Sequence, residues 1–401
     1  YEVELPLTRV LYKMEKQGFA VDKQVLSEAG YELDKKIMAL ANEIYEYAGE
    51  QFNINSPKQL GHILFERLGL PYGKKTKSGY STDVETLARL SGKHPIIEKI
   101  IEYRQAAKLK STYVDGLMSS VGKDGKIHTK FMQTITSTGR LSSIEPNLQN
   151  IPVRTEEGKQ LRKAFIPSGE KRILIDADYS QIELRVMAHV SMDPSMIEAF
   201  RNREDIHAST AAKVFGVPKE LVSNQMRSDA KAVNFGIIYG ISDFGLSKNI
   251  DIGIKEANEF IELYFKNYPS VKEYMNTSIT DAKANGYVKT MFGRKRMMKE
   301  LSSRNYNERS FGERVAINMP IQGSAADIIK IAMLRIDREL EQRGLDAKMI
   351  LQVHDEIIID APLNEKETVE QLLKECMENV ITLKVPLEVD ISSGTNWYNC
   401  K

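Results

Sequence analysis

Two short apolar segments that carry acids lie far apart in the sequence, and they constrain the fold more than any other feature. The first reads RILIDAD over residues 172–178, and the second reads MILQV over 349–353 followed by IIIDA over 357–361. Their length and their branched side chains predict buried strands. Helical spacing dominates residues 196–283 between them. The sequence therefore predicts an α+β fold in which a helical insertion splits a small sheet.

Helical spacing also dominates the first part of the chain. Gly18 follows one helical stretch, and Asp22 is placed to cap the next helix. That helix, over residues 23–49, would be about 40 Å long, which favours a projecting arm over a buried core helix. Residues 53–82 contain a lysine-rich loop and are expected to form the tip of the arm, and the helical pattern resumes over 84–118.

A further helix is expected near the C-terminal end, from about Ser324 to Gly344, because apolar residues recur at helical spacing and a glycine ends the pattern. A chain of 401 residues predicts two to four subdomains. Its two cysteines, Cys376 and Cys400, predict neither a disulfide framework nor a metal cluster, and they indicate a reducing compartment. No run of 18 apolar residues occurs, so no membrane span is expected.

The formal net charge of +1 does not by itself indicate a nucleic-acid partner. Basic residues nevertheless gather in three short runs, which are either solvated faces or parts of a local basic stripe. The runs are Lys74, Lys75 and Lys77; Lys108 and Lys110; and Arg294, Lys295 and Arg296.

The acids of the apolar strands are the first candidate site. Asp176 and Asp178 share one face of their strand because strand side chains alternate. The other two strands predict a hairpin with His354, Asp355 and Glu356 at its bend. Acids in apolar surroundings are costly unless a cation compensates them, and aspartate oxygens with substrate phosphates are ligands that Mg²⁺ takes. The alternative is a set of acids at strand ends that face water.

A stripe of cations and rings is the second candidate site. Arg227, Lys231, Phe235 and Tyr239 recur every four residues, so they drift by only about 40° per step around a helix over residues 224–240. The cations occupy the N-terminal half, where free N–H groups and the helix dipole favour anions. A nucleotide along this face would meet charge first and aromatic surface second. The alternative is an amphipathic helix whose aromatic rings pack in a core.

Five segments in the same order resemble a known family. Three of them resemble motifs A, B and C of the family A DNA polymerases, the bacterial DNA polymerase I group: DYSQIELRVMAH (178–189), RSDAKAVNFGIIYG (227–240) and VHDE (353–356). Two more match other segments of that family: TSTGRLSSIEPNLQNIPVR (136–154) and INMPIQGSAADIIK (317–330). The resemblance runs from about Leu5 to Lys401.

The resemblance implies a right-hand polymerase fold with an antiparallel-sheet palm, helical fingers and a helical thumb. The implied divisions are a palm-associated helix at 1–21, the thumb at 22–125, a first part of the palm with motif A at 126–192, the fingers at 193–308 with the motif B helix at 224–240, and a second part of the palm with motif C at 309–401.

The resemblance further implies that Asp178 and Asp355 hold two Mg²⁺ ions, for which Mn²⁺ can substitute, with help from the carbonyl of Tyr179. Glu356 is similar to a carboxylate that assists near the metals without being strictly required. Asp176 departs from the family, which usually has a small or apolar residue there, and it is expected to lie beside the ligands and not among them.

The implied nucleotide site consists of the fingers stripe and residues that face it. Glu183 is expected under the sugar, where it blocks a 2′-hydroxyl, and Ser228 departs from the family's arginine but lies off the stripe. The full set is Arg227, Lys231, Phe235, Tyr239, His207, Glu183 and Gln181, with Lys231 also counted as catalytic.

The implied contacts to primer-template DNA are Arg140, Asn147, Gln149, Arg314, Asn318, Gln322, His354, Lys108 and Lys110. The minor groove shows acceptors at the same places in every base pair, so Arg140, Gln149 and Gln322 can test the shape of a pair without reading its sequence.

The expected function is template-directed DNA synthesis for replication and repair, with dNTPs added to a primer 3′-hydroxyl and pyrophosphate released. A monomer without 3′–5′ exonuclease activity and without membrane attachment is expected, in the bacterial cytoplasm with the nucleoid; phage or organellar origin stays open. A single-subunit RNA polymerase is the first alternative, and Glu183 argues against it. An inactive module that grips duplex DNA is the second, and Asp178, Asp355, Arg227 and Lys231 argue against it.

Overall fold

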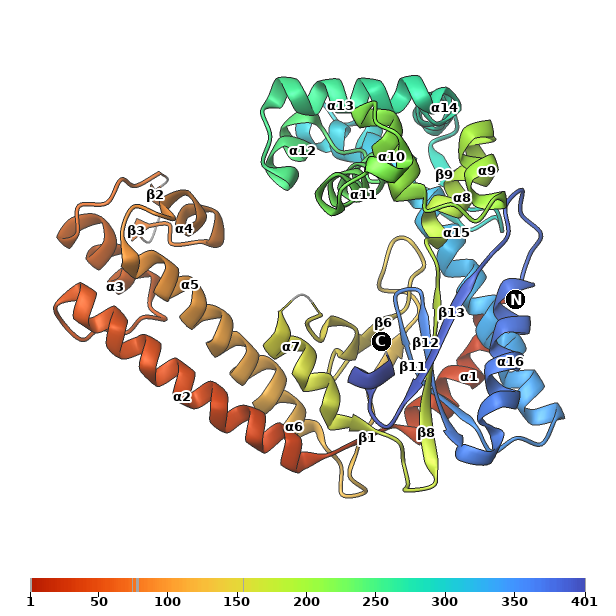
Figure 1. The fold of residues 1–401 in the computed structure, drawn as a ribbon, viewed down its shortest axis with the longest axis horizontal. Coiled ribbons are helices and arrows are strands. Elements are labelled where there is room, and N and C mark those ends of the chain that lie inside the picture. The colour runs from red at the N-terminus through yellow and green to blue at the C-terminus, as the bar shows by residue number, and fades with distance from the viewer. Residues whose placement is uncertain (1, 74, 77–78, 154, 401) are drawn as a thin grey trace.

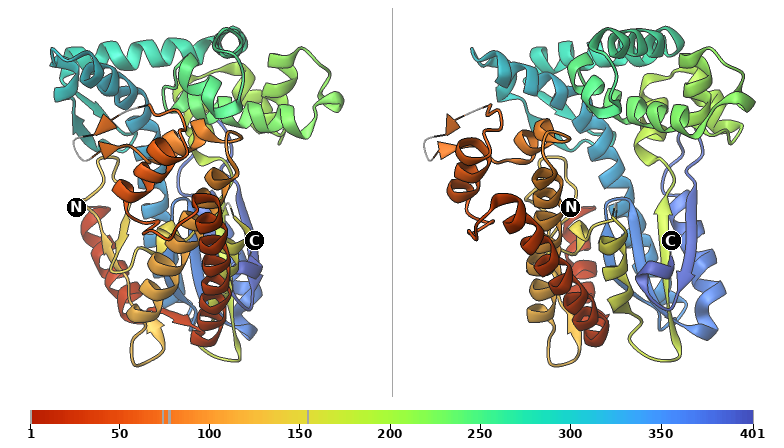
Figure 2. Two further views of the ribbon diagram at one scale, coloured as in Figure 1. Left: turned by 90° about the vertical axis from the view of Figure 1, so that its left-hand side faces the viewer. Right: turned by 60° about the vertical axis from the view of Figure 1, so that its left-hand side comes forward.

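The computed structural model describes residues 2–73, 75–76, 79–153 and 155–400. A small sheet forms the base of the molecule, an arm of long helices extends to one side of it, and a block of helices lies above it (Figure 1). The views in Figure 2 show the arm and the helical block as separate masses that rise from the same base. The predicted α+β architecture with a split sheet is present.

The central sheet has four antiparallel strands that come from distant parts of the chain. The predicted strands at 172–178, 349–353 and 357–361 are confirmed to within one residue at each end. In spatial order the strands are β11 (Lys348–Val353), β12 (Glu356–Pro362), β8 (Arg172–Tyr179) and β13 (Val389–Gly394).

The two faces of this sheet are covered differently. Helix α16 (Lys366–Glu378) packs on one face, where the Tyr179 hydroxyl donates to the carbonyl of Met377 at 2.7 Å. Since side chains alternate along β8, Asp176 and Asp178 point to the opposite face. That face meets two short 3₁₀-helices, η4 (Leu161–Ala164) and η8 (Trp397–Cys400).

The arm is built on α2 (Lys23–Ala48), and the Asp22 side chain caps it by accepting from the backbone N–H of Gln24 at 2.9 Å, as predicted. The tip of the arm was expected to contain a lysine-rich loop, and this expectation is only partly right. A short helix lies there, which Ser56 caps and which has Pro57 at its first position. Lys74 and Lys77 lie outside the described residues. The arm further comprises α3 (Pro57–Gly61), a π-helix η1 (His62–Arg67), β2 (Lys75–Thr76), β3 (Gly79–Tyr80), α4 (Val84–Leu90), α5 (Pro95–Lys108), a π-helix η2 (Leu109–Asp115) and α6 (Gly116–Ser120).

The helical block follows β8, as predicted from the spacing over 196–283. Helix α11 packs against α10, and Tyr264 and Tyr268 are buried in the interior of the block. Its elements are α8 (Ile182–Ser191), α9 (Pro194–Arg201), α10 (Ile206–Phe215), η5 (Lys219–Leu221), α11 (Asn224–Ile238), α12 (Asp243–Ile250), α13 (Ile254–Asn267), α14 (Pro269–Asn285), β9 (Tyr287–Lys289), β10 (Lys295–Met297) and η6 (Lys299–Ser302).

A single helix, α15 (Tyr306–Gln342), joins the helical block to the base of the molecule. The predicted start near Ser324 was wrong, since the helix continues through Pro320. Proline removes one backbone donor, but buried side chains on both sides, including Ala316 and Ile321, hold the helix together. The expected division between residues 308 and 309 falls inside this helix.

The remaining elements surround the base. Gly18 ends α1 (Glu4–Gln17) with a positive φ of 63°, and Cys376 and Cys400 are both buried. Within the described residues no helix has the length and apolar character that crossing a membrane requires. These elements are β1 (Phe19–Val21), β4 (Lys126–Ile127), β5 (Lys130–Met132), β6 (Ser142–Ile144), η3 (Leu148–Asn150), α7 (Glu156–Gln160), β7 (Phe165–Ile166) and η7 (Leu363–Glu365).

A buried ionic network ties α1 to α15 and to the β9–β10 hairpin. Lys330 is fully buried, and its ammonium donates to Glu4 Oε1 at 2.8 Å. Arg294 Nη2 donates to Asp327 Oδ1 at 2.7 Å and also to Glu4. The basic run that begins at Arg294 was expected to be a solvated face or a basic stripe, but its first residue is engaged in this network.

We expect Glu4→Ala to lower the free energy of unfolding by about 2 kcal/mol, because it leaves Lys330 buried without this carboxylate; the figure is reduced for the partial exposure of Glu4. Burial raises the pKa of Glu4, but hydrogen bonds from Lys330 and Arg294 outweigh it, so the net pKa lies below 4.5. The stabilisation is therefore present above pH 4.5 and is lost as the pH falls further.

Urea unfolding followed by tryptophan emission measures this loss, with Glu2→Ala at an exposed position as the control. Equal free energies of unfolding for the two variants would show that the contacts of Glu4 in this network contribute nothing to stability.

Candidate active site

The two predicted metal-binding acids lie together at one end of the sheet. Asp178 is near the end of β8, and Asp355 lies in the tight turn between β11 and β12. The backbone N–H of Tyr179 donates to the carbonyl of Asp355 at 3.1 Å, which fastens the turn to the end of β8. His354 occupies the same turn with a φ of 53° and is exposed.

One rung of the sheet carries three carboxylates. Asp178 is paired with Glu356 on one side and with Asp390 on the other. Asp390 was not anticipated, because the segment VDISSG gives a weak strand signal and β13 was not predicted. Like charges directly opposite one another destabilise a sheet, so this rung calls for a nearby cation.

Arg140 brings positive charge to this end of the sheet. Its Nη2 lies 2.6 Å from Glu183 Oε1 and 3.7 Å from Asp355 Oδ1. Burial raises the pKa of Asp355, and the guanidinium of Arg140 opposes that rise. The protein alone therefore does not fully compensate the charge of Asp355.

Glu183 stands in the first turn of α8 and is 3% exposed. Its second carboxylate oxygen accepts from the Tyr239 hydroxyl at 3.1 Å, and Gln322 also hydrogen bonds to it. Burial raises the pKa of Glu183, while Arg140 opposes the rise. Residues from three separate parts of the chain thus converge on one buried carboxylate.

The predicted stripe on α11 faces outward. Arg227 and Lys231 are exposed, Phe235 is half-buried and Tyr239, which follows the last helical residue, is 41% exposed. The buried residues Val233 and Ile237 lie on the other side of the helix. Arg227, Lys231 and Tyr239 are thus exposed, whereas Phe235 lies against the buried ring of His207, with the ring centres 5.8 Å apart. The nucleotide role of the stripe stays a prediction.

A carboxylate of the protein pairs with the first cation of the stripe. Asp205 Oδ2 accepts from Arg227 Nε at 2.5 Å. His207 is 2% exposed, and its Nδ1 lies 3.0 Å from the side-chain nitrogen of Asn234. Burial lowers the pKa of His207 to about 4, so its imidazole is neutral at pH 7. Gln181 sits just before α8 in a left-handed conformation with a φ of 50°.

The donor set at the sheet end suits a hard cation. Asp178, Asp355 and the Tyr179 carbonyl offer only oxygen atoms. No three His, Cys, Asp or Glu side chains of the described ranges converge closely enough to hold a metal by themselves. Mg²⁺ is commonly held by one or two carboxylates together with substrate phosphates and water, so these residues fit it.

The sequence profile of the family described as DNA polymerase family A matches residues 23–399. The chain belongs to this family. The predicted family is thereby confirmed.

Curated relatives of the same family match the whole chain. DNA polymerase I of Lactococcus lactis subsp. cremoris is 54% identical over 401 residues, and DNA polymerase I of Bacillus subtilis is 53% identical over 401 residues. Each alignment covers 100% of this chain and 46% of the relative, so the chain spans about half the length of the curated relatives it matches.

A solved structure confirms the predicted right-hand fold. The polymerase domain of Pol1 from M. smegmatis, in complex with DNA primer-template and dNTP, matches with a TM-score of 0.94 at 45% identity. The match covers 99% of this chain and 70% of that one. In the terms of this fold the sheet is the palm, the helical block is the fingers and the arm is the thumb.

Several predicted DNA contacts of this family A chain are engaged within the protein. The side chain of Gln149 accepts from the Ser143 backbone N–H at 3.1 Å and donates to the Gln352 carbonyl at 3.1 Å. Asn147 caps the short helix η3, and the Asn318 side chain donates to a carbonyl at the end of α11 at 3.4 Å. For these residues the structure shows positioning roles, and contact with DNA stays a prediction.

The other predicted lysine and arginine contacts lie in the thumb and in the N-terminal part of α15. Lys110 pairs with Asp115 at 2.9 Å and Asp34 at 3.4 Å, so acids offset its charge, whereas Lys108 is exposed on α5. Arg314 packs so closely against Gly240 that a side-chain carbon added there would lie 2.9 Å from its Cγ.

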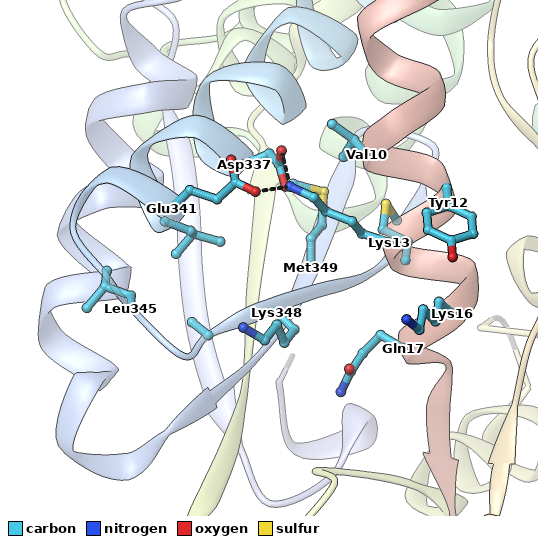
Figure 3. Close-up of a pocket in the computed structure, with 13 residues that line it drawn as sticks. Val10, Tyr12, Lys13, Lys16, Gln17, Asp337, Glu341, Leu345, Lys348 and Met349 are labelled. Atoms are coloured by element: carbon cyan, nitrogen blue, oxygen red, sulfur yellow. Dashed lines mark hydrogen bonds and ion pairs between the residues drawn. The ribbon is translucent and has the colours of Figure 1, made fainter.

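A separate cavity of about 410 Å³ lies between α1 and the palm (Figure 3). Lys13 crosses it to donate to Asp337 at 2.7 Å and to Glu341 at 2.6 Å. Lys348, at the far end of β11 from the Asp355 turn, lies on its rim. This cavity is therefore not the candidate active site.

We expect the ring resonances of His207 to titrate with a midpoint of about pH 4, because burial disfavours its charged form. The folded-state pKa lies below the ordinary value of 6.5. Stability from the neutral ring is thus fully present above pH 6.5 and is lost as the pH falls toward 4.

NMR titration checks the midpoint, and His207→Asn identifies the resonances. Over the same pH range, the unfolding free energy of His207→Asn should fall less than that of the wild type. A midpoint above pH 6 would contradict the prediction.

Proposed function

We propose that the chain is a template-directed DNA polymerase that adds dNTPs to a primer 3′-hydroxyl and releases pyrophosphate. The observation that carries the proposal is the meeting of Asp178 and Asp355 at the end of the palm, beside Glu183 and the end of the fingers helix. The M. smegmatis domain, which is solved with DNA primer-template and dNTP, supports these partners for this chain.

Asp178, Asp355 and the Tyr179 carbonyl would hold two Mg²⁺ ions, or Mn²⁺ in their place. When bound, such ions stabilise the attacking and leaving oxygens of an in-line displacement. Glu356 stands next to this pair on β12.

The fingers stripe receives the nucleotide. Arg227 and Lys231 neutralise the triphosphate, Arg227 by exchanging Asp205 for phosphate oxygens. Phe235 and Tyr239 offer ring surface to the sugar and base, and Glu183 closes the space beside C2′. Gln181 and His207 flank the site, His207 as a neutral ring.

The thumb binds the DNA, and the palm tests the shape of the new base pair. Lys108 and Lys110 contact phosphates, and His354 and Arg314 contact the strands near the primer end. Arg140 and Gln322 test the minor-groove edge of the new pair, with Gln149, Asn147 and Asn318 in support.

The proposed divisions are a palm-associated helix at 1–21, thumb at 22–125, palm at 126–192 and 309–401, and fingers at 193–308. We further propose a monomer that works on DNA in the bacterial cytoplasm in replication and repair. The family profile accounts for residues 23–399 as polymerase, which supports the absence of a 3′–5′ exonuclease site from this chain.

Asp178→Ala and Asp355→Ala are expected to abolish primer extension and to leave primer-template binding within about tenfold, since binding rests on phosphate contacts spread over thumb and palm. A gel assay of extension in Mg²⁺ and a fluorescence-anisotropy titration measure the two properties. Asp176→Ala is the matched control on the same strand face and should retain most activity. Extension by either of the first two variants would refute the assignment.

Glu183→Ala is expected to raise ribonucleotide insertion strongly and to lower deoxynucleotide efficiency, because the cavity left beside C2′ admits a hydroxyl and loosens the correct sugar. Phe235→Tyr should accept dideoxynucleotides far better, since its hydroxyl replaces the missing 3′-hydroxyl. The measurements are the ribo/deoxy and dideoxy/deoxy ratios of kcat/KM. Unchanged ratios with altered stability would mean that both residues are structural only, and a wild-type preference for ribonucleotides would favour an RNA polymerase.

A further inference from the structure

The chain has a single tryptophan, and it lies directly behind the catalytic end of the palm. Trp397 is fully buried in η8, which follows β13. Its indole Nε1 donates to Glu356 Oε1 at 3.2 Å. Glu356 itself is 4% exposed and is the residue next to Asp355. An indole N–H can only donate, so Glu356 Oε1 is the acceptor in this contact.

A buried arginine completes the arrangement. The guanidinium carbon of Arg162 lies 3.9 Å from the centre of the Trp397 ring, and the residue is 5% exposed. Its Nε and Nη1 have no hydrogen-bond partner among the residues that the structure describes. Burial lowers the pKa of Arg162, and the charges of Glu356 and Asp176 oppose this. A buried cation is costly unless nearby charge compensates it.

The position of Arg162 indicates a role for its buried positive charge. The side chains of Asp176, Asp178 and Glu356 share the sheet face that η4 and η8 cover. Arg162 is a buried cation near Glu356 and Asp176, while Arg140 lies beside Asp355 and Glu183. Two arginines thus contribute positive charge to the acidic group.

We propose that Trp397 and Arg162 are positioning residues that hold the Glu356 carboxylate toward the protein interior, so that Asp178 and Asp355 alone among the acids of the palm bind the metal ions. This inference rests on the proposed polymerase function. Trp397 supplies the hydrogen bond and the ring surface, and Arg162 supplies permanent positive charge behind the acids. Released from Trp397, Glu356 would turn toward the metal ions and disturb the geometry of both aspartates.

Trp397→Phe keeps a ring against Arg162 but removes the N–H donor. We expect kcat to fall about fivefold, with KM for dNTP and Kd for primer-template within about twofold, because the loss affects only the arrangement of the acids. Phe19→Leu is the matched control: Phe19 lies 6.0 Å from Trp397 between ring centres, so the variant weakens the same core without removing the bond to Glu356. It should lower Tm and leave kcat unchanged.

A double-mutant cycle separates positioning from mere stability. Glu356→Gln removes the carboxylate charge, so adding Trp397→Phe to it should lower kcat by less than twofold further. Independent, multiplying effects of the two substitutions on kcat would overturn the proposal.

The wild-type protein provides a readout that needs neither core substitution nor activity. Trp397 emission should change saturably when Mg²⁺ is titrated at constant ionic strength into the complex with dNTP and a primer-template whose primer ends in a dideoxynucleotide, and Asp178→Asn should abolish the change. An emission that ignores Mg²⁺, or a folded Trp397→Phe variant with wild-type kcat, would overturn this inference. An active Asp178→Ala variant would instead overturn the proposed function, so the two failures are distinguishable.

Discussion

The crowding of negative charge at one end of the palm is the constraint on which the rest of the structure depends. Asp178, Glu356 and Asp390 occupy one rung of the sheet, and Asp355 lies in the adjoining turn. Four acids so close together are unfavourable unless positive charge surrounds them. The fold places Arg140 beside Asp355, and Arg162 near Glu356 and Asp176.

The long helix α15 and the buried ionic network around Lys330 and Arg294 help to position Arg140, which supplies part of this positive charge. Arg294 reaches from the β9–β10 hairpin to Asp327 and Glu4, and it also packs against Gly139. A side-chain carbon added at Gly139 would lie 2.5 Å from Arg294 Nε, and the φ of Gly139 is +84°, so glycine is required there. The neighbouring Arg140 is thus aimed at Glu183 by packing that begins at the N-terminal helix.

Much of this arrangement could be predicted from the sequence where a local pattern determines the outcome. The apolar runs around Asp178 and Asp355 predicted the hairpin and its partner strand, and Asp22 predicted the start of α2. The even spacing from Arg227 to Tyr239 predicted that the four side chains share one face of α11. These features follow from strand alternation, capping and helical period, which need no knowledge of distant residues.

The remaining features depend on contacts between distant segments. The apolar spacing predicted a helix that starts near Ser324, but tertiary packing extends α15 back through Pro320 to Tyr306. No local sequence pattern identified Asp390, Trp397 or Arg162 as part of the site, because their roles depend on strand pairing and ring stacking across the palm. Arg294 looked like part of a surface run and is instead an internal partner. In each case the residues that lie nearby in space, and not those nearby in the sequence, determine the environment of the side chain.

The ion pair between Arg227 and Asp205 has a consequence for the proposed binding of nucleotides by the fingers. A nucleotide bound at Arg227 would displace a carboxylate whose Oδ2 lies 2.5 Å from the guanidinium Nε. In the proposed function a triphosphate would compete with Asp205 better than a monophosphate, because it carries more charge and more oxygen atoms and would also meet Lys231. The displaced carboxylate still caps α10, since its other oxygen accepts from the backbone N–H of His207. If the fingers bind the nucleotide in this way, the ion pair would favour nucleotides with more phosphates before a base pair forms, and it would form again once pyrophosphate has left.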